Sequence, residues 1–321
     1  MKKHKTLYPP LIFNIFKPAR ITSYDVIRHF KRNLPDGFGK IGHFGTLDPF
    51  ASGVLMVGIG GAARLNDFIH EFMPKTYIAV GKLGIETPTG DYTGEIVQRD
   101  DSLYLTQEIA RLPKNFLEER FKSKFVGDYW QAPHKYSAAK FMGKNLHEWA
   151  REGVEVKKEA VLRQIYSIKV LKYSFPYLAI EVTVSSGTYV RSLFTDLCND
   201  LGTIGYLVSL VRSRVGNVEA IQALHKKDWP LKGSSAIMGR AMKVNDVLSF
   251  PTIRLDELQT KAFKNGAFMS FSDLTSRYCW VVDEHENLLG LAEKVSEEQF
   301  KPKINFGSVE LAGLSSDHDL L

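Results

Sequence analysis

One short stretch decides the fold: residues 42–55 read GHFGTLDPFASGVL. It sets a single carboxylate, Asp48, in a loop that Pro49 stiffens and that glycines open to close approach by a ligand. The apolar run that follows, Gly53 to Ile59, is short and continuous, which is typical of a buried strand. Taken alone, Asp48 would more often start an Asp-Pro turn or cap a helix than react. The surrounding sequence has to decide between these two interpretations.

The segments on either side of this loop alternate between helical and extended patterns. Val26, Ile27 and Phe30 recur at helical spacing after Thr22 or Ser23, either of which would cap a helix ending at residue 32. Apolar spacing predicts further helices over residues 62–72, 191–201 and 234–248, and strands over residues 75–83, 154–156, 166–173, 178–185, 278–282 and 288–292. This irregular order of elements favours a mixed α+β fold over a regular βαβ repeat.

Length and composition indicate a globular chain with one large domain and one small one. The chain has 321 residues, of which 44% are hydrophobic and 24% charged, enough apolar material for a core. Phe250-Pro251 is the predicted boundary between a larger domain, residues 1–249, and a small one, residues 250–307, followed by a frayed tail, residues 308–321. No apolar run approaches the roughly 18 to 20 residues of a membrane span, so we expect a cytoplasmic protein.

Charge is divided unevenly along the chain. Residues 251–321 contain 7 Lys/Arg and 12 Asp/Glu, a net of −5, which leaves +11 for residues 1–250. Within that part, residues 131–172 have 9 Lys/Arg against 4 Glu. A solvated basic face without a partner explains such a charge about as well as a polyanion does. Aromatic residues between the cations favour nucleic acid, because stacking and phosphate contacts usually occur together: Tyr129, Trp130, Tyr136, Phe141 and Trp149.

Several chemical classes are disfavoured. Cys198 and Cys279 are the two cysteines, and neither they nor the nine histidines have metal-ligand spacing, so we expect no metal and no disulfide. Residues 58–63 read GIGGAA, which fits a dinucleotide-binding turn, but the strand that follows lacks the acidic residue that binds the ribose. A phosphate-binding P-loop fails because no GK[ST] follows. The sequence therefore predicts an enzyme or binding protein without a cofactor.

The stretch around Asp48 resembles the active-site motif of the TruB-type tRNA pseudouridine synthases, and the resemblance extends in order over about residues 11–215. Further stretches resemble other motifs of that family: Lys17-Pro18 with Thr22, Ser23 and Asp25; Lys75-Thr76-Tyr77 with Leu83-Gly84, Thr87, Thr89, Asp91 and Gly94; Gln131-Ala132-Pro133 with Tyr136-Ser137-Ala138, Lys140 and Gly143-Lys144; Ser186 to Arg191; and Leu210-Val211-Arg212. The resemblance implies a mixed, largely antiparallel sheet in the catalytic domain, with an RNA-clasping insertion at about residues 125–158. It also implies a small, mostly β, PUA-like C-terminal domain.

The resemblance further implies isomerisation of uridine to pseudouridine at position 55 in the tRNA T arm, by a cytoplasmic monomer. Asp48 would be the nucleophile or base, adding to C1′ or to the uracil, and Arg191 would pair with it. An arginine near a predicted helix start is unfavourable for the helix dipole, which by itself suggests a carboxylate partner. Tyr77 would stack on the flipped base and assist proton removal, with His43, Tyr189 and Leu210 around it. Further substrate contacts would come from Lys17, Lys140, Lys144 and Arg212.

Two points stand apart from this pattern. Arg20 occupies a position where the family usually has Gly, so it either changes the local backbone or adds a phosphate contact. The acidic C-terminal part is a poor match for an RNA-binding domain. The rival functions are an RNA-binding or RNA-folding protein without enzymatic activity, which the joint presence of Asp48, Tyr77 and Arg191 disfavours, and the dinucleotide enzyme.

Overall fold

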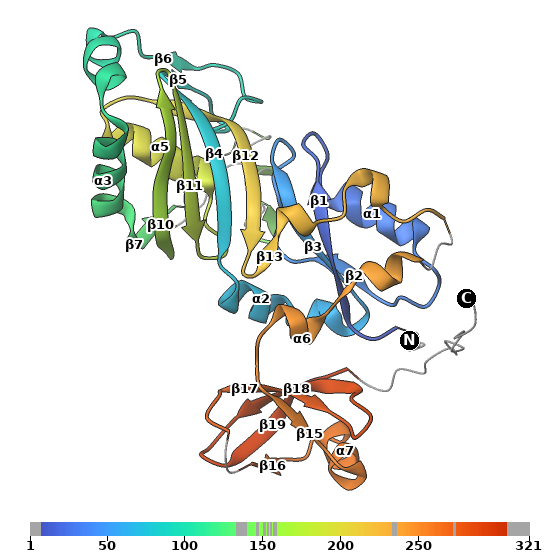
Figure 1. Cartoon of the computed structure of the whole chain (residues 1–321). Helices are drawn as coiled ribbons and strands as arrows, with labels where there is room; N and C mark the ends of the chain where they lie inside the picture. The colour runs from blue at the N-terminus through green and yellow to red at the C-terminus, as the bar shows by residue number, and fades with distance from the viewer. Residues whose placement is uncertain are drawn as a thin grey trace, which may run out of the picture.

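The computed structural model describes residues 8–132, 140–145, 148–149, 152, 154, 156, 159–232, 236–271 and 274–306. Several residues of the predicted RNA-clasping insertion, among them Pro133, Tyr136, Ser137, Ala138 and Lys157, lie outside the described residues, as does the predicted tail. The chain forms a large unit built on one long sheet and a smaller unit below α2 and α6 (Figure 1).

The large unit is organised by a ten-stranded sheet. Its main path runs in the order β14-β1-β3-β12-β4-β11-β10-β7, with β13 beside β12 and β2 beside β3. Every pairing is antiparallel except the short contact between β12 and β3. The strands are β1 (Leu11–Lys17), β2 (Ile41–His43), β3 (Ser52–Ile59), β4 (Lys75–Leu83), β7 (Gly127–Gln131), β10 (Val161–Ser174), β11 (Tyr177–Val184), β12 (Gly205–Val215), β13 (Val218–Glu219) and β14 (Met242–Lys243). The predicted mixed, largely antiparallel α+β fold is confirmed.

The parallel contact between β3 and β12 depends on a glycine of the deciding stretch. Gly53 pairs with Arg212, and its φ of +109° lies in the left-handed region. A Cβ at this position would lie 2.2 Å from the carbonyl oxygen of Arg212. Only glycine allows the two backbones to approach this closely. The close pairing of Gly53 with Arg212 places the loop that carries Asp48 directly beside β12.

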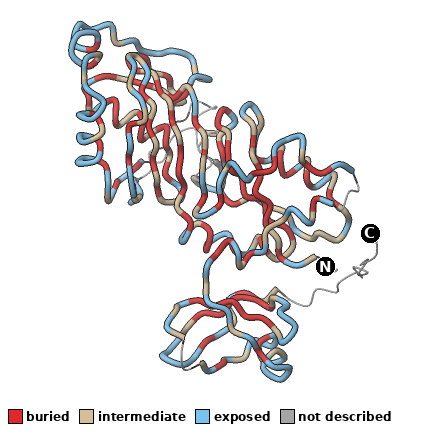
Figure 2. The backbone as a smooth tube through the Cα atoms, viewed as in Figure 1, coloured by how far each residue is buried: buried red, intermediate tan, exposed pale blue. Residues whose placement is uncertain are grey.

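Helices cover the sheet and carry their own termination signals. In α1 (Ser23–Asn33), Thr22 caps the N-terminus and Asp25 completes the capping box, while Val26, Ile27 and Phe30 face the core. α3 (Lys114–Phe125) buries one face on β10, and α5 (Val190–Asp200) lies against β4 and β12. Figure 2 shows the central strands buried and the outer face of α3 exposed. The remaining elements of this unit are α2 (Asn66–Phe72), α6 (Val244–Val247), β5 (Ile85–Glu86), β6 (Gln98–Arg99), β8 (Lys140–Phe141) and β9 (Lys144–Asn145), together with short 3₁₀ and π turns.

The structure corrects three element predictions. Residues 234–248 do not form one helix: a 3₁₀ turn, Ala236–Arg240, is followed by β14 and then by the four-residue α6. Val154 and Val156 lie outside any strand, and Glu155 lies outside the described residues. The predicted helix over residues 62–72 is split into a 3₁₀ turn, Gly60–Leu65, and α2. In the first case β14 pairs with β1, so a partner distant in sequence overrides the local helical pattern.

The small unit is a five-stranded sheet with one helix. Its strand order is β15-β17-β18-β19-β16, and α7 (Glu257–Lys264) packs against β19. The strands are β15 (Thr252–Arg254), β16 (Met269–Ser270), β17 (Tyr278–Val282), β18 (Leu288–Lys294) and β19 (Gln299–Asn305). The sequence predicts β17 correctly and β18 up to its last two residues. The predicted mostly β C-terminal region is confirmed.

The two units share a hydrophobic core. Trp280 of β17 is fully buried and donates its indole N–H to the carbonyl of Leu248. Tyr278 packs edge-on against Phe68 of α2, with ring centres 5.0 Å apart. The same buried cluster reaches Phe44, four residues before Asp48. Packing therefore continues without a break from the small sheet to the loop of the deciding stretch.

Candidate active site

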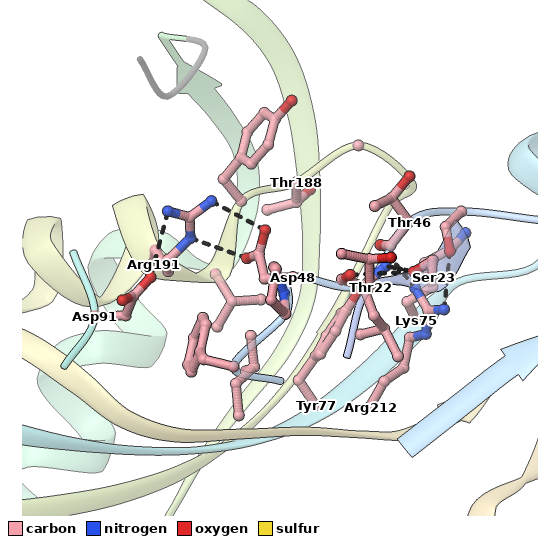
Figure 3. A pocket seen from close by; sticks show the side chains of 18 of the residues that line it. Thr22, Ser23, Thr46, Asp48, Lys75, Tyr77, Asp91, Thr188, Arg191 and Arg212 are labelled. Carbon is pink, nitrogen blue, oxygen red and sulfur yellow. Dashed lines mark hydrogen bonds and ion pairs between the residues drawn. The ribbon is translucent and has the colours of Figure 1, made fainter. Parts of the chain in front are cut away.

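A cavity of about 790 Å³ opens beside the Asp48 loop. Its walls come from the loop itself, from β4 and β12, from the start of α5 and from residues 22–24 (Figure 3). Such a volume lies in the range of ordinary ligand pockets. Of the predicted site residues, the cavity brings together Asp48, Tyr77, Arg191, His43, Tyr189, Leu210 and Arg212.

Asp48 is held by a two-pronged ion pair with Arg191. Arg191 Nε lies 2.9 Å from Oδ2 of Asp48, and Arg191 Nη2 donates to Oδ1 at 3.1 Å. The other side of the guanidinium meets Asp91, whose Oδ2 is 3.5 Å from Nη1, and the same nitrogen donates to the carbonyl of Thr89 at 2.7 Å. Arg191 is 4% exposed, so this arrangement is fixed inside the protein. The planar fork matches a carboxylate in a way that a lysine cannot.

The surroundings of Asp48 shift the pKa of its carboxyl in opposite directions. Burial raises the pKa of the Asp48 carboxyl above its ordinary value, and the positive charge of Arg191 opposes that rise. The negative charge of Asp91 adds to the rise. A carboxylate that is desolvated yet held by one guanidinium is oriented and poorly solvated, as a nucleophile or base requires.

Apolar and aromatic side chains form the walls around this carboxylate. Tyr77 on β4 is 7% exposed and lies in register with Arg212 on β12, while Leu210 lies in register with Ala79. The backbone of Tyr189 is fixed by Gln131, which accepts from its N–H at 2.7 Å and donates to its carbonyl at 3.0 Å. A flat aromatic surface faces a space in which a planar group could stack.

His43 lies on β2 at the edge of the cavity. Its Nδ1 is buried and has no hydrogen-bond partner within the described part of the chain. Burial lowers the pKa of the His43 imidazole, and the charge of Arg212 adds to that effect. His43 is therefore neutral at neutral pH.

Comparison with known proteins identifies the family. Residues 31–190 match the model of the TruB family pseudouridylate synthase, N-terminal domain. The tRNA pseudouridine synthase B of Clostridium tetani is 33% identical over 291 residues, which covers 89% of this chain and 96% of that protein. The chain belongs to the TruB family.

Other relatives agree with this assignment. The tRNA pseudouridine synthase B of Caldanaerobacter subterraneus is 32% identical over 91% of this chain and 97% of that protein. A solved Cbf5-Nop10-Gar1 complex contains a chain that matches with a TM-score of 0.66 over 94% of this chain and 86% of that chain, at 20% identity. The structural likeness supports the fold, and the sequence likeness supports the TruB family.

Lys17 and Arg212 are buried and hold the backbone near Asp48. Lys17 is fully buried, and its amine donates to the carbonyls of Pro18, Ile21 and Pro49. In this structure the Lys17 side chain has no accessible surface, and its predicted contact with substrate stays a prediction. Arg212 reaches the cavity wall but is 1% exposed, and it donates to the carbonyls of Val54 and Gly45. Both cations fix the backbone on which Asp48 stands.

Of the two lysines that we predicted to bind RNA from the RNA-clasping insertion, Lys144 does not line the cavity. Lys140 belongs to β8, and its side chain lies outside the described residues. Lys144 on β9 lies over the ring of Trp149, 4.5 Å from its centre, and forms an ion pair with Glu152. Contact of either lysine with RNA stays a prediction.

Sequence reasoning missed the roles of Asp91 and Lys75. Both stand in stretches that resemble family motifs, yet their contacts lie far away in the chain: Asp91 meets Arg191, and Lys75 donates to Ser186 Oγ. One signal was available for Lys75, because residues two apart on a strand share a face and Tyr77 faces the cavity. No comparable signal existed for Asp91.

The described residues contain no cluster of His, Cys, Asp and Glu suited to a metal ion. Cys198 and Cys279 are both free and buried. No helix in the described ranges combines the length and the apolar character needed to cross a membrane.

Arg20, in the turn between β1 and α1, shows what a non-glycine residue costs at this position. Its φ is 72°, in the left-handed region, and its N–H donates to the carbonyl of Pro49 at 2.7 Å. We expect Arg20→Gly to raise the free energy of unfolding by about 0.5 to 1 kcal/mol, because relief of strain exceeds the extra chain entropy. Urea unfolding measures the change. Arg20→Ala retains the strain and is the control, and an equal gain in both variants would contradict this explanation.

Proposed function

We propose that this TruB-family enzyme isomerises uridine to pseudouridine at position 55, in the T arm of tRNA. The curated relatives are tRNA pseudouridine synthases, and the chain shares about a third of its residues with them over nearly its whole length. The single observation that carries the proposal is Asp48, held by the fork of Arg191 at the wall of a cavity of about 790 Å³. The enzyme would act as a monomer in the cytoplasm, without a cofactor.

The reaction needs few groups. The C1′–N1 bond breaks, the uracil turns, and a C1′–C5 bond forms, while the C5 proton is lost and N1 regains a proton. No oxidant and no second substrate take part. The Asp48 carboxylate would add to C1′ as the C1′–N1 bond breaks and be displaced as C5 bonds to C1′, or it would add to the uracil ring and be eliminated from it once the new bond has formed. Arg191 would keep that carboxylate ionised and aimed at the nucleoside.

Access to the uridine requires base flipping. A uridine inside a folded RNA arm is stacked, so the enzyme has to extrude it and hold it in a pocket. Tyr77 offers an aromatic face for the flipped base, Leu210 an apolar wall, and Tyr189 a rim at the start of α5. His43 would support the neighbouring nucleotides from the edge of the pocket.

The test of the proposal is a map of pseudouridine in tRNA. Chemical probing of tRNA from a strain without its own enzyme should show unmodified uridine at position 55, and expression of this chain should restore the modification there. A synthetic T-arm stem-loop should be modified in vitro, and an anticodon stem-loop should serve as the unmodified control. Modification elsewhere with position 55 untouched would contradict the site, and absence of pseudouridine everywhere would contradict the activity.

Tyr77→Phe separates stacking from proton removal. Phe keeps the aromatic face and removes the hydroxyl, so RNA binding should change less than about threefold. If the hydroxyl assists loss of the C5 proton, product formation should slow by about 10²-fold while glycosidic cleavage continues, because general acid–base groups contribute about this much. Single-turnover assays that follow substrate loss and pseudouridine separately measure both steps. Equal rates for the two proteins would leave Tyr77 with stacking alone.

A further inference from the structure

The cavity has a second charged end, away from the Asp48 and Arg191 pair. Lys75 of β4 and Arg212 of β12 lie together on the side opposite Arg191 (Figure 3). Both side chains reach Gly45 from the same side: a Cβ there would lie 3.3 Å from Lys75 Cε and 3.6 Å from Arg212 Nη1. Two cations thus converge at the wall of the pocket that would receive the flipped nucleotide.

This end of the cavity has no negative charge to balance it. Lys75 is 3% exposed and Arg212 is 1% exposed, and in the described ranges neither forms an ion pair with a carboxylate. Arg191 differs, since Asp48 and Asp91 flank it. Buried cations are normally paired, because removal of a charge from water is costly. Arg212 donates to the backbone carbonyls of Val54, Thr46 and Gly45, but these carry no full negative charge, so the two cations lack a counter-ion among the described residues. This points to an anion that arrives from outside.

Lys75 has a donor available for that anion. An ammonium carries three N–H donors. Two contacts are present, to Ser186 Oγ and to the carbonyl of Met73 at 3.4 Å, the second of which is long. Burial, with a smaller contribution from the charge of Arg212, lowers the pKa of Lys75 to about 7, so the amine is partly neutral until an anion enters. The neighbouring His70 also has a lowered pKa, from burial and from the charge of Lys75.

We propose that Lys75, with Arg212 behind it, binds a phosphate group of the RNA backbone beside the flipped uridine. The inference rests on the proposed function only in taking RNA as the ligand. A phosphate offers several acceptor oxygens and a full negative charge, which matches a compact ammonium. It would also explain why so polar a group lies in the wall of a pocket for an uncharged base: the backbone on either side of a flipped nucleotide has to enter with it.

A neutral backbone analogue tests this directly. Synthetic T-arm stem-loops are prepared with a methylphosphonate in place of the phosphate 5′ or 3′ of the target uridine, which removes one charge and keeps the shape. One of the two should bind wild-type protein at least about tenfold more weakly than unmodified RNA, as expected when a charge-assisted hydrogen bond is lost. Lys75→Met should weaken binding of unmodified RNA by a similar factor and should show no further loss with that analogue. Lys82→Met, on the same strand but with its amine over the ring of Tyr177, is the matched control and should bind both RNAs like wild type.

Proton uptake gives a second measurement that needs no variant. Phosphate binding should draw Lys75 into its charged form, so at pH 8 the wild-type protein should take up close to one more proton with unmodified RNA than with the analogue. Calorimetry in two buffers of different ionisation enthalpy measures the difference, and the comparison cancels uptake at Lys17, whose pKa is lowered to about 8 by burial.

The outcomes separate the inference from the proposed function. Equal affinity for unmodified RNA and both analogues, or a Lys75→Met loss that is the same with every RNA, would overturn the phosphate site while pseudouridine formation continued. Proton uptake with inorganic phosphate alone, together with normal binding of both analogues, would assign the site to free phosphate and overturn the RNA assignment. Failure to form pseudouridine from any RNA would instead contradict the proposed function.

Discussion

Asp48→Asn should lower pseudouridine formation by more than about 100-fold while tRNA affinity changes by less than about threefold. The amide has nearly the shape of the carboxylate, so the cavity and its contacts persist, but it is neither a nucleophile nor a base. Single-turnover conversion of T-arm RNA measures the first quantity, and filter binding at fixed salt measures the second.

A matched control distinguishes this result from a general effect of lost negative charge. Asp101 is an exposed carboxylate of the same unit, outside the cavity lining, and Asp101→Asn should have normal turnover. Residual activity of Asp48→Asn above about one-hundredth of wild type would mean that Asp48 is not the nucleophile or base of the reaction. A parallel loss of RNA binding would instead indicate a role in assembly of the pocket.

Arg191→Lys should also reduce kcat/KM by about 100-fold or more, although the positive charge remains. The guanidinium meets both oxygens of Asp48 and also reaches Asp91 and the carbonyl of Thr89. A lysine is a point charge that cannot span these partners, so the two carboxylates would be less well screened from each other. Steady-state kinetics with T-arm RNA measures the effect.

The pH dependence adds a signature that simple misfolding would not produce. Arg191 lowers the pKa of Asp48 against the rise caused by burial, so a weaker partner lets that pKa rise further. The ionised form then appears only at higher pH, and the acid limb of the kcat/KM profile should move upward in Arg191→Lys. Arg120→Lys is the control: Arg120 also holds an aspartate, Asp200, at 2.7 Å, but neither residue lines the cavity, and its change should leave turnover and profile intact. An unchanged acid limb in Arg191→Lys would mean that the fork does not govern the charge of Asp48.

The parts of the fold that the sequence predicted are those set by local chemistry. The helix from Ser23 has a capping box and an apolar stripe within its own length, and β4 alternates in burial from Tyr77 to Leu83. The Asp48 loop was recognisable because glycines and Pro49 shape it from within. The helix predicted over residues 234–248 is wrong because the spacing of apolar residues there is helical, whereas Met242 and Lys243 pair with β1. β1 lies at the opposite end of the unit's sequence, so this pairing could not be read from local spacing.

The site was predictable to the extent that its residues stand in stretches that resemble motifs of the family. Asp48 and Arg191 were expected to pair, and they do, although 143 residues separate them. Lys17 was predicted to bind substrate because Lys17-Pro18 resembles a family motif, and the motif gave no sign that its amine donates to three backbone carbonyls. Asp91 and Lys75 gained their partners only through folding, and no spacing rule links them to Arg191 or Arg212.

The core shared by the two units bears on the modularity of the protein. A domain that can be exchanged or removed ends in a polar linker with few contacts across it. Here Trp280, Tyr278 and Leu291 of the small sheet complete the packing of Phe68 and of the cluster that contains Phe44. A chain cut near Ser249 would expose this apolar surface to water. The small unit thus helps to support the Asp48 loop. The two units should therefore unfold in one cooperative transition, even if only one of them contacts RNA.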